Sequence, residues 1–359
     1  MLDKQAKLID LLFKKEEIDS ILLTSMDDIF YLTEFTGSEA SVIVSKDGIY
    51  FFSDFRYETE ANDEVKNAEV LIYKDKFKEI KNFVKTMGLR KIGFEPKSFS
   101  YDLYEKYKNG FKTYAELKPL KKGISSLRVL KNNEEIEKIK KAARIAETSF
   151  NNTLKLVKEG VSERFLSLRF EFNARKLGAE RLSFDTIAAS GIRGAMPHGK
   201  PSDKLIRKNE LITFDFGIVS NGYCSDETVT VSLGKAAKKQ KEIYQIVYDA
   251  QRYAFEKIKP SVPLKEVDKA ARSFIEKKGY GKYFGHGLGH GVGINVHEEP
   301  VVSFKSKGIC RENMVFTVEP GIYIPNWGGI RIEDMIVVKK GGCEKLTYIR
   351  KELKELEVF

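Results

Sequence analysis

The 359-residue sequence has little cysteine, little proline and no long apolar run. Its three cysteines, Cys224, Cys310 and Cys343, are odd in number and form no CxxC pair, so we expect buried, reduced thiols in a cytosolic protein. The 9 prolines and 27 glycines exclude collagen-like and low-complexity classes. No segment approaches the ~18 apolar residues of a membrane span, and the charged residues after Met1 interrupt any secretory signal. We therefore expect a cytoplasmic protein without a membrane partner.

Acidic residues are fewer than basic ones, 52 against 62, which gives a net charge of +10. Such an excess can indicate a nucleic-acid partner. Here the lysines are mostly interleaved with acidic and apolar residues, as on solvated helix faces, and no aromatic and basic signature accompanies them. We therefore expect no nucleic-acid partner.

The chain is long enough for two unequal domains. Its first third alternates helix and strand patterns. Strands are predicted over 21–24, 42–44, 49–52, 70–73 and 92–94, and helices near 75–87 and 98–107, after an amphipathic start at Leu8, Leu11 and Leu12. The pattern breaks into Pro, Gly, Ser and Lys around 117–128. We predict a small N-terminal α/β domain over 1–123 and a second α/β domain over 124–359.

The second domain contains four helical patterns. Asn132, with Glu135 three residues later, can cap a long helix whose apolar stripe ends before Gly160. Similar stripes predict helices over 163–177, 240–258 and 264–275, with strands between and after them.

A short motif occurs twice in this domain. Residues 213–218 and 317–322 share the form T-x-acid-x-G-I, and each copy is followed by an Asn-containing turn and a second acidic strand. The repeat indicates two similar halves, each of which presents a pair of carboxylates.

Four carboxylates lie in strongly apolar strand sequences. Asp215, Glu319 and Glu333 interrupt such strands, and Asp226 follows the first of them. Burial of a bare carboxylate is costly unless a cation or hydrogen bonds compensate. Arg331 is the only obvious cation nearby, so ordinary ion pairing does not account for all four.

Histidine is scarce, yet three of the four histidines, His286, His290 and His297, lie within residues 285–300. Alternating glycines there favour an extended backbone and exclude the helical HExxH zinc pattern. One imidazole with four carboxylates suits Mn²⁺, Co²⁺ or a catalytic Zn²⁺ pair. Five side chains fit two ions that share bridging carboxylates, roughly 3.5–4 Å apart, which predicts hydrolysis by a metal-bridged water.

At this point the residues resemble a known family, the pita-bread metallopeptidases, and within it the proline-directed branch of Xaa-Pro aminopeptidase and Xaa-Pro dipeptidase (prolidase). The matching segments are Met196–Lys200, Phe214–Gly217 with Tyr223–Asp226, His286–Gly293, His297–Pro300, Thr317–Gly321 and Arg331–Asp334. Residues 54–57 resemble, more weakly, a segment of the extra N-terminal domain of that branch. The resemblance implies a C-terminal pita-bread domain with two pseudo-twofold halves, a homodimer, and peptide substrates with proline at the second position.

The resemblance also implies roles for individual residues. Two divalent ions, manganese or cobalt with zinc as the other candidate, would be bound by Asp215, Asp226, His290, Glu319 and Glu333, with Asp226 and Glu333 bridging. His198, His297 and Glu319 would be catalytic: the two histidines would also contact substrate and stabilise the charge that develops on the scissile carbonyl, and Glu319 would accept a proton. His286 would line the proline pocket, and Arg331 would orient a ligand carboxylate. One departure is Val229, where the branch commonly has arginine.

The residues predict metal-dependent hydrolysis, and the resemblance implies an exopeptidase of the Xaa-Pro aminopeptidase type, with Xaa-Pro dipeptidase as the close alternative. A dipeptidase needs a cation for the product-side carboxylate, and the sequence does not place one. The alternative of another class is an inactive binding protein on the same fold. Hydrolysis of an amidine, as in the creatine-degrading relatives, fits less well because that branch works without metals.

Overall fold

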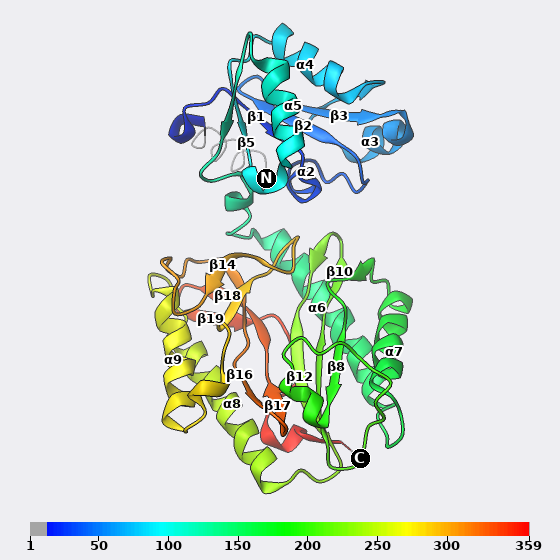
Figure 1. The fold of residues 1–359 in the computed structure, drawn as a ribbon, viewed down its shortest axis with the longest axis vertical. Coiled ribbons are helices and arrows are strands. Elements are labelled where there is room, and N and C mark those ends of the chain that lie inside the picture. Colours follow the sequence, from blue (N-terminus) through cyan, green and yellow to red (C-terminus); the bar gives the residue numbers. More distant parts are fainter. Residues whose placement is uncertain (1–12, 359) are drawn as a thin grey trace. The chain divides into compact units, whose positions relative to one another are not determined.

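The computed structural model describes residues 13–358. The chain divides into two compact units, Met1–Arg128 and Val129–Phe359 (Figure 1). The predicted amphipathic start at Leu8, Leu11 and Leu12 lies outside the described residues. Among the helices of residues 13–358, none combines the length and the apolar character that crossing a bilayer requires.

The N-terminal unit is built on a six-stranded mixed sheet with the order β4-β3-β2-β1-β5-β6. Its strands are β1 (Ser20–Leu23), β2 (Ser41–Ser45), β3 (Ile49–Asp54), β4 (Glu69–Tyr73), β5 (Lys91–Phe94) and β6 (Glu116–Pro119). Its helices are α2 (Met26–Thr33), α3 (Glu58–Glu64), α4 (Lys76–Thr86) and α5 (Tyr101–Phe111). The sequence patterns miss α2 and α3, which are short, and β6, an edge strand that tolerates a terminal proline.

The second unit contains four long helices, as the apolar stripes predict. They are α6 (Asn133–Leu154), α7 (Glu163–Lys176), α8 (Lys238–Lys257) and α9 (Leu264–Lys277). The predicted capping box is present at α6: Asn132 Oδ1 accepts from the Glu135 N–H at 2.9 Å, and Glu135 Oε2 accepts from the Asn132 N–H at 2.7 Å. Figure 1 shows α7 and α9 at opposite edges of this unit, with strands between them.

Two main sheets occupy the centre of this unit. The first has the order β20-β12-β9-β8, with β8 (Ile187–Ser190), β9 (Leu211–Phe216), β12 (Glu227–Leu233) and β20 (Glu357–Val358). The second has the order β14-β13-β15-β18-β19, with β13 (Gly289–Gly291), β14 (Glu298–Val302), β15 (Val315–Val318), β18 (Asp334–Lys339) and β19 (Gly342–Lys345). The smaller strands are β7 (Arg181–Leu182), β10 (Ile218–Ser220), β11 (Tyr223–Cys224), β16 (Gly321–Ile324) and β17 (Gly328–Arg331).

The two halves of this unit repeat one pattern. Each has a long helix, a second helix of 14 residues, and an antiparallel strand order in which β8-β9-β12 corresponds to β13-β15-β18. The hairpin β16–β17 takes the place of β10–β11. The prediction of two similar halves is therefore confirmed.

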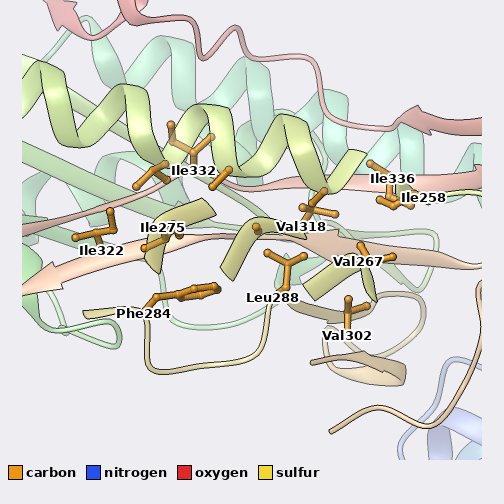
Figure 2. Close-up of a cluster of buried hydrophobic side chains, with 14 of the residues drawn as sticks. Ile258, Val267, Ile275, Phe284, Leu288, Val302, Val318, Ile322, Ile332 and Ile336 are labelled. Carbon is orange, nitrogen blue, oxygen red and sulfur yellow. The ribbon is translucent and has the colours of Figure 1, made fainter. Parts of the chain in front are cut away.

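Each half has its own hydrophobic core. In the first half, Phe150 of α6 and Phe170 of α7 pack on Phe216 of β9. In the second half, residues of α9 such as Ile275 lie with Val318 and with residues of β18 (Figure 2). These cores fix the strands whose ends carry the predicted acidic residues.

Candidate metal centre

A cavity of about 870 Å³ lies in the second unit. The structure brings every sequence-predicted site residue to its wall. They are His198, Asp215, Asp226, His286, His290, His297, Glu319, Arg331 and Glu333.

The four carboxylates reach the cavity from equivalent places in the two halves. Asp215 lies near the end of β9 and Asp226 immediately before β12, and these antiparallel strands pair Asp215 with Thr228. Glu319 directly follows β15 and Glu333 directly precedes β18, the antiparallel partner of β15. Each half therefore supplies two acidic side chains from one end of a strand pair.

His290, at the centre of β13, lies among these acids. Its Nε2 is 3.5 Å from Asp226 Oδ2 and 3.5 Å from Glu319 Oε1. One ligand atom each from Asp226, His290 and Glu333 lies within 4.8 Å of the others. This spacing is compatible with ligands around a shared ion.

The electrostatics of the cluster favour bound cations. Burial, followed by repulsion from the other carboxylates, holds the pKa values of Asp226 and Glu333 well above their ordinary range. Burial likewise raises the pKa of Glu319 to about 8 and lowers that of His290 to about 4. Asp215 Oδ1 is buried without a hydrogen-bond partner in the described chain. Divalent ions fit this donor set because they would neutralise the acids and bind the orphaned oxygen.

Two glycines allow β13 to pass through this crowded region. A β-carbon at Gly289 would overlap the carbonyl group of Thr317 on β15, and one at Gly291 would overlap the carbonyl group of Glu299 on β14. Both positions therefore require glycine for close backbone approach, and this explains part of the alternating glycine pattern.

Arg331 compensates one of the four acids. Its Nη2 donates to Asp215 Oδ2 at 2.7 Å, and its Nη1 donates to the Tyr323 hydroxyl at 3.0 Å. That hydroxyl lies 3.0 Å from His286 Nε2, while His286 Nδ1 is 2.8 Å from the Gly287 carbonyl oxygen. Burial lowers the pKa of His286 to about 4, so a neutral ring donates through Nδ1 and accepts from Tyr323.

Three further residues of the site are not among those predicted from the sequence: Tyr323, which contacts Arg331 and His286, and two threonines that contact the acids. Thr228 Oγ1 donates to Glu333 Oε2 at 2.6 Å and accepts from Arg331 Nε at 3.0 Å. Thr317 Oγ1 donates to Glu319 Oε1 at 3.3 Å and accepts from the His290 N–H at 3.1 Å. The repeated T-x-acid motif contained Thr317, but threonine is also an ordinary strand residue.

Val229, at the position where the branch commonly has arginine, lies on the core side of β12. Its side chain is buried in the core of the first half, whereas Thr228 and Thr230 on either side contact Arg331. Successive strand residues face opposite sides, so Val229 points away from Arg331. Arg331, which contacts Asp215 and Thr228, belongs to the second half.

His198 and His297 form another part of the cavity wall, and both residues are exposed. The His297 ring lies 4.1 Å, between centroids, from the His290 ring at a steep angle of 74°. Burial is the largest cause of the lowered pKa of His297, so its imidazole is neutral near pH 7.

Comparison with known proteins gives matches over both units. The model of metallopeptidase family M24 matches residues 137–340, and the creatinase/prolidase N-terminal domain matches residues 5–130. An uncharacterized peptidase of Bacillus subtilis is 43% identical over 95% of this chain and 97% of its own length. The Xaa-Pro dipeptidase of Pyrococcus horikoshii is 39% identical over 98% of this chain and 99% of its own.

Solved structures of similar proteins include two with different names. The Xaa-Pro dipeptidase from Bacillus anthracis superposes with a TM-score of 0.95 at 40% identity and covers 99% of both chains. The X-Pro aminopeptidase from Thermotoga maritima superposes with a TM-score of 0.90 at 37% identity, over 94% of this chain and 98% of its own.

Proposed function

The chain belongs to metallopeptidase family M24, and from this premise we propose that it is a dinuclear exopeptidase that hydrolyses the Xaa-Pro bond at peptide N-termini. The observation that carries the proposal is the convergence of four carboxylates and His290 on one cavity. Relatives named Xaa-Pro dipeptidase and X-Pro aminopeptidase support the substrate class.

In this proposal, Asp215, Asp226, His290, Glu319 and Glu333 would hold two divalent ions, manganese or cobalt with zinc as the other candidate. Asp226 and Glu333, one from each half, would be the carboxylates shared by the two ions. When bound, the ions supply Lewis-acid activation of water and of the scissile carbonyl.

Side chains of the protein carry out the other steps, namely proton transfer, stabilisation of the carbonyl oxygen and orientation of a ligand. Glu319, held by Thr317, accepts the proton of the attacking water. His198 and His297 donate hydrogen bonds to the carbonyl oxygen on which negative charge develops. Arg331 orients Asp215, since its guanidinium lies 2.7 Å from that carboxylate.

The proposed substrate class follows from the amide itself. The bond before proline has no N–H, so recognition relies on shape and on the carbonyl oxygen. His286 supplies a suitable wall for the proline ring, because it packs edge-on against Phe284 at 5.1 Å and lies 5.5 Å from the Tyr323 ring.

Two lysines of the cavity wall are relevant to the length of the peptide that the site accepts as substrate. Lys200 and Lys282 line the cavity, together with Arg331, which is paired with Asp215. A nearby ammonium group would hold the product-side carboxylate of a dipeptide. We therefore favour Xaa-Pro dipeptides as substrates, and Xaa-Pro aminopeptidase activity is the second candidate, supported by the Thermotoga maritima structure.

A comparison of an Xaa-Pro dipeptide with an Xaa-Pro-Xaa tripeptide tests this proposal. We expect Lys282→Met to raise KM for the dipeptide roughly tenfold, because an ionic hydrogen bond contributes about 1.5 kcal/mol or more. The tripeptide, whose carboxylate lies elsewhere, should change little. Lys278→Met, on the exposed end of the neighbouring helix, is the control. Failure of the metal-loaded wild-type protein on both peptides would end the peptidase proposal.

A further inference from the structure

A buried lysine connects the segments that carry the proposed bridging ligands. The Lys351 side chain is 1% exposed, and its Nζ lies 2.8 Å from Asp334 Oδ1. The same ammonium group also donates a short hydrogen bond to the Glu227 carboxylate. Both acids are as buried as the lysine itself.

These two acids occupy equivalent positions in the two halves. Glu227 directly follows Asp226 at the start of β12, and Asp334 directly follows Glu333 at the start of β18. Neighbouring residues of an extended chain face opposite sides. Accordingly, within the described chain, Asp226 and Glu333 line the cavity, whereas Glu227, Asp334 and Lys351 do not.

The chain around Lys351 is anchored to both halves. The Leu346 N–H donates to the Met335 carbonyl oxygen of β18 at 2.8 Å, and β20 pairs with β12 at the other end of this segment. Between these anchors the Tyr244 hydroxyl of α8 donates to the Lys351 carbonyl oxygen at 3.1 Å. Lys351 thus lies in the middle of a strap, residues 346–358, that passes from the second sheet to the first.

We propose that Lys351 is a positioning residue that joins the starts of β12 and β18 and thereby holds Asp226 and Glu333 at the separation the metal pair requires. This inference rests on the proposed function for the identity of the ligands. The two halves also meet here through Thr228, whose carbonyl oxygen accepts from the Glu333 N–H at 3.1 Å and whose hydroxyl binds the Glu333 carboxylate. A third link is Arg331, which contacts Asp215 and Thr230. Without the ammonium group, the buried carboxylates of Glu227 and Asp334 would lose the partner that joins them, and the two strand starts would separate.

Calorimetric titration of the metal-free protein with Mn²⁺ tests this role apart from activity. We expect Lys351→Met to weaken Mn²⁺ binding about tenfold. This is the low end of the loss of metal affinity that follows when residues supporting the metal ligands are mutated. The visible spectrum of the Co²⁺-loaded variant should also change, because the ligand geometry relaxes. Lys131→Met is the matched control: Lys131 is equally buried and pairs with Glu298 at 2.5 Å, away from these strand starts. It should lower thermal stability and leave Mn²⁺ affinity unchanged.

Loss of one partner from a buried pair can prevent folding, so Glu227→Gln/Lys351→Met is measured beside the single variant. The double variant removes the link between the two strand starts and leaves no unpaired Glu227 charge. Asp334 still has two partners, the Thr347 hydroxyl at 2.7 Å and the Lys345 ammonium group at 2.9 Å. The same loss of affinity is expected. Wild-type affinity in either folded variant would overturn the role of Lys351 alone, whereas a wild-type protein that binds no Mn²⁺ would overturn the proposed function as well.

Discussion

Asp226→Asn or Glu333→Gln should reduce kcat/KM on an Xaa-Pro substrate at least about a thousandfold, which corresponds to about 4 kcal/mol of transition-state stabilisation. The physical reason is the proposed bridging role, since a neutral amide cannot supply the charge that holds two divalent ions together. Steady-state kinetics at saturating Mn²⁺ measure the effect.

The fold should survive both substitutions. Burial and mutual repulsion raise the pKa values of the two carboxyls, so an ionised acid destabilises the metal-free native state. Each amide variant should therefore unfold, without metal, at a midpoint equal to or above that of the wild-type protein. Near wild-type turnover by a fully folded variant would exclude the bridging mechanism.

Removal of the metal should abolish activity and also expose a characteristic pH dependence of stability. In the metal-free protein the Glu319 pKa is raised to about 8, and those of Asp226 and Glu333 are raised well above normal. Such groups are protonated in the folded state and ionised in the unfolded state. Their stabilising contribution is complete below the unfolded pKa and is lost as pH rises through the folded pKa.

The histidines change the free energy of unfolding in the opposite direction, and they do so at lower pH. Burial lowers the pKa values of His286 and His290 from 6.5 to about 4, so their contribution is present above 6.5 and is lost as pH falls towards 4. Between pH 6.5 and about 8 the carboxyls therefore dominate. The free energy of unfolding should fall by about 1.4 kcal/mol per pH unit for each carboxyl that stays protonated.

Mn²⁺ should remove this slope, because binding requires deprotonated ligands, so the loaded native state and the unfolded state then hold equal numbers of protons at these carboxyls. Urea unfolding of the metal-free and Mn²⁺-loaded protein across this pH range measures both slopes. Glu319→Gln removes one titrating group and should flatten the metal-free slope. Identical pH dependence with and without Mn²⁺ would contradict the assignment of these carboxylates as ligands.

The candidate site was predictable where a residue type conflicted with its local sequence. An acid such as Asp215 in a strand that is otherwise apolar demands a partner, and three histidines in a glycine-rich stretch do not suit a core. The two halves were likewise visible in the repeated T-x-acid motif. The resemblance to the pita-bread metallopeptidases is confirmed by the family match over residues 137–340.

Other residues were hidden because nothing local marks them. Thr228 and Tyr323 are ordinary strand and core residues by type, and only the fold shows that they contact Glu333 and His286. Lys351 lies in a charged run that predicts a solvated surface, yet the strap buries it between two acids from different halves. The contacts of Thr228 with Glu333 and of Lys351 with Glu227 join residues more than 100 positions apart, so they depend on the topology and not on sequence spacing.

Anomalous diffraction at the manganese absorption edge, from crystals of the Mn²⁺-loaded protein, tests the proposed metal pair most directly. We expect two anomalous peaks in the cavity, enclosed by Asp215, Asp226, His290, Glu319 and Glu333. Crystals with no peak among these five side chains, or with manganese bound only elsewhere, would contradict the proposed metal pair.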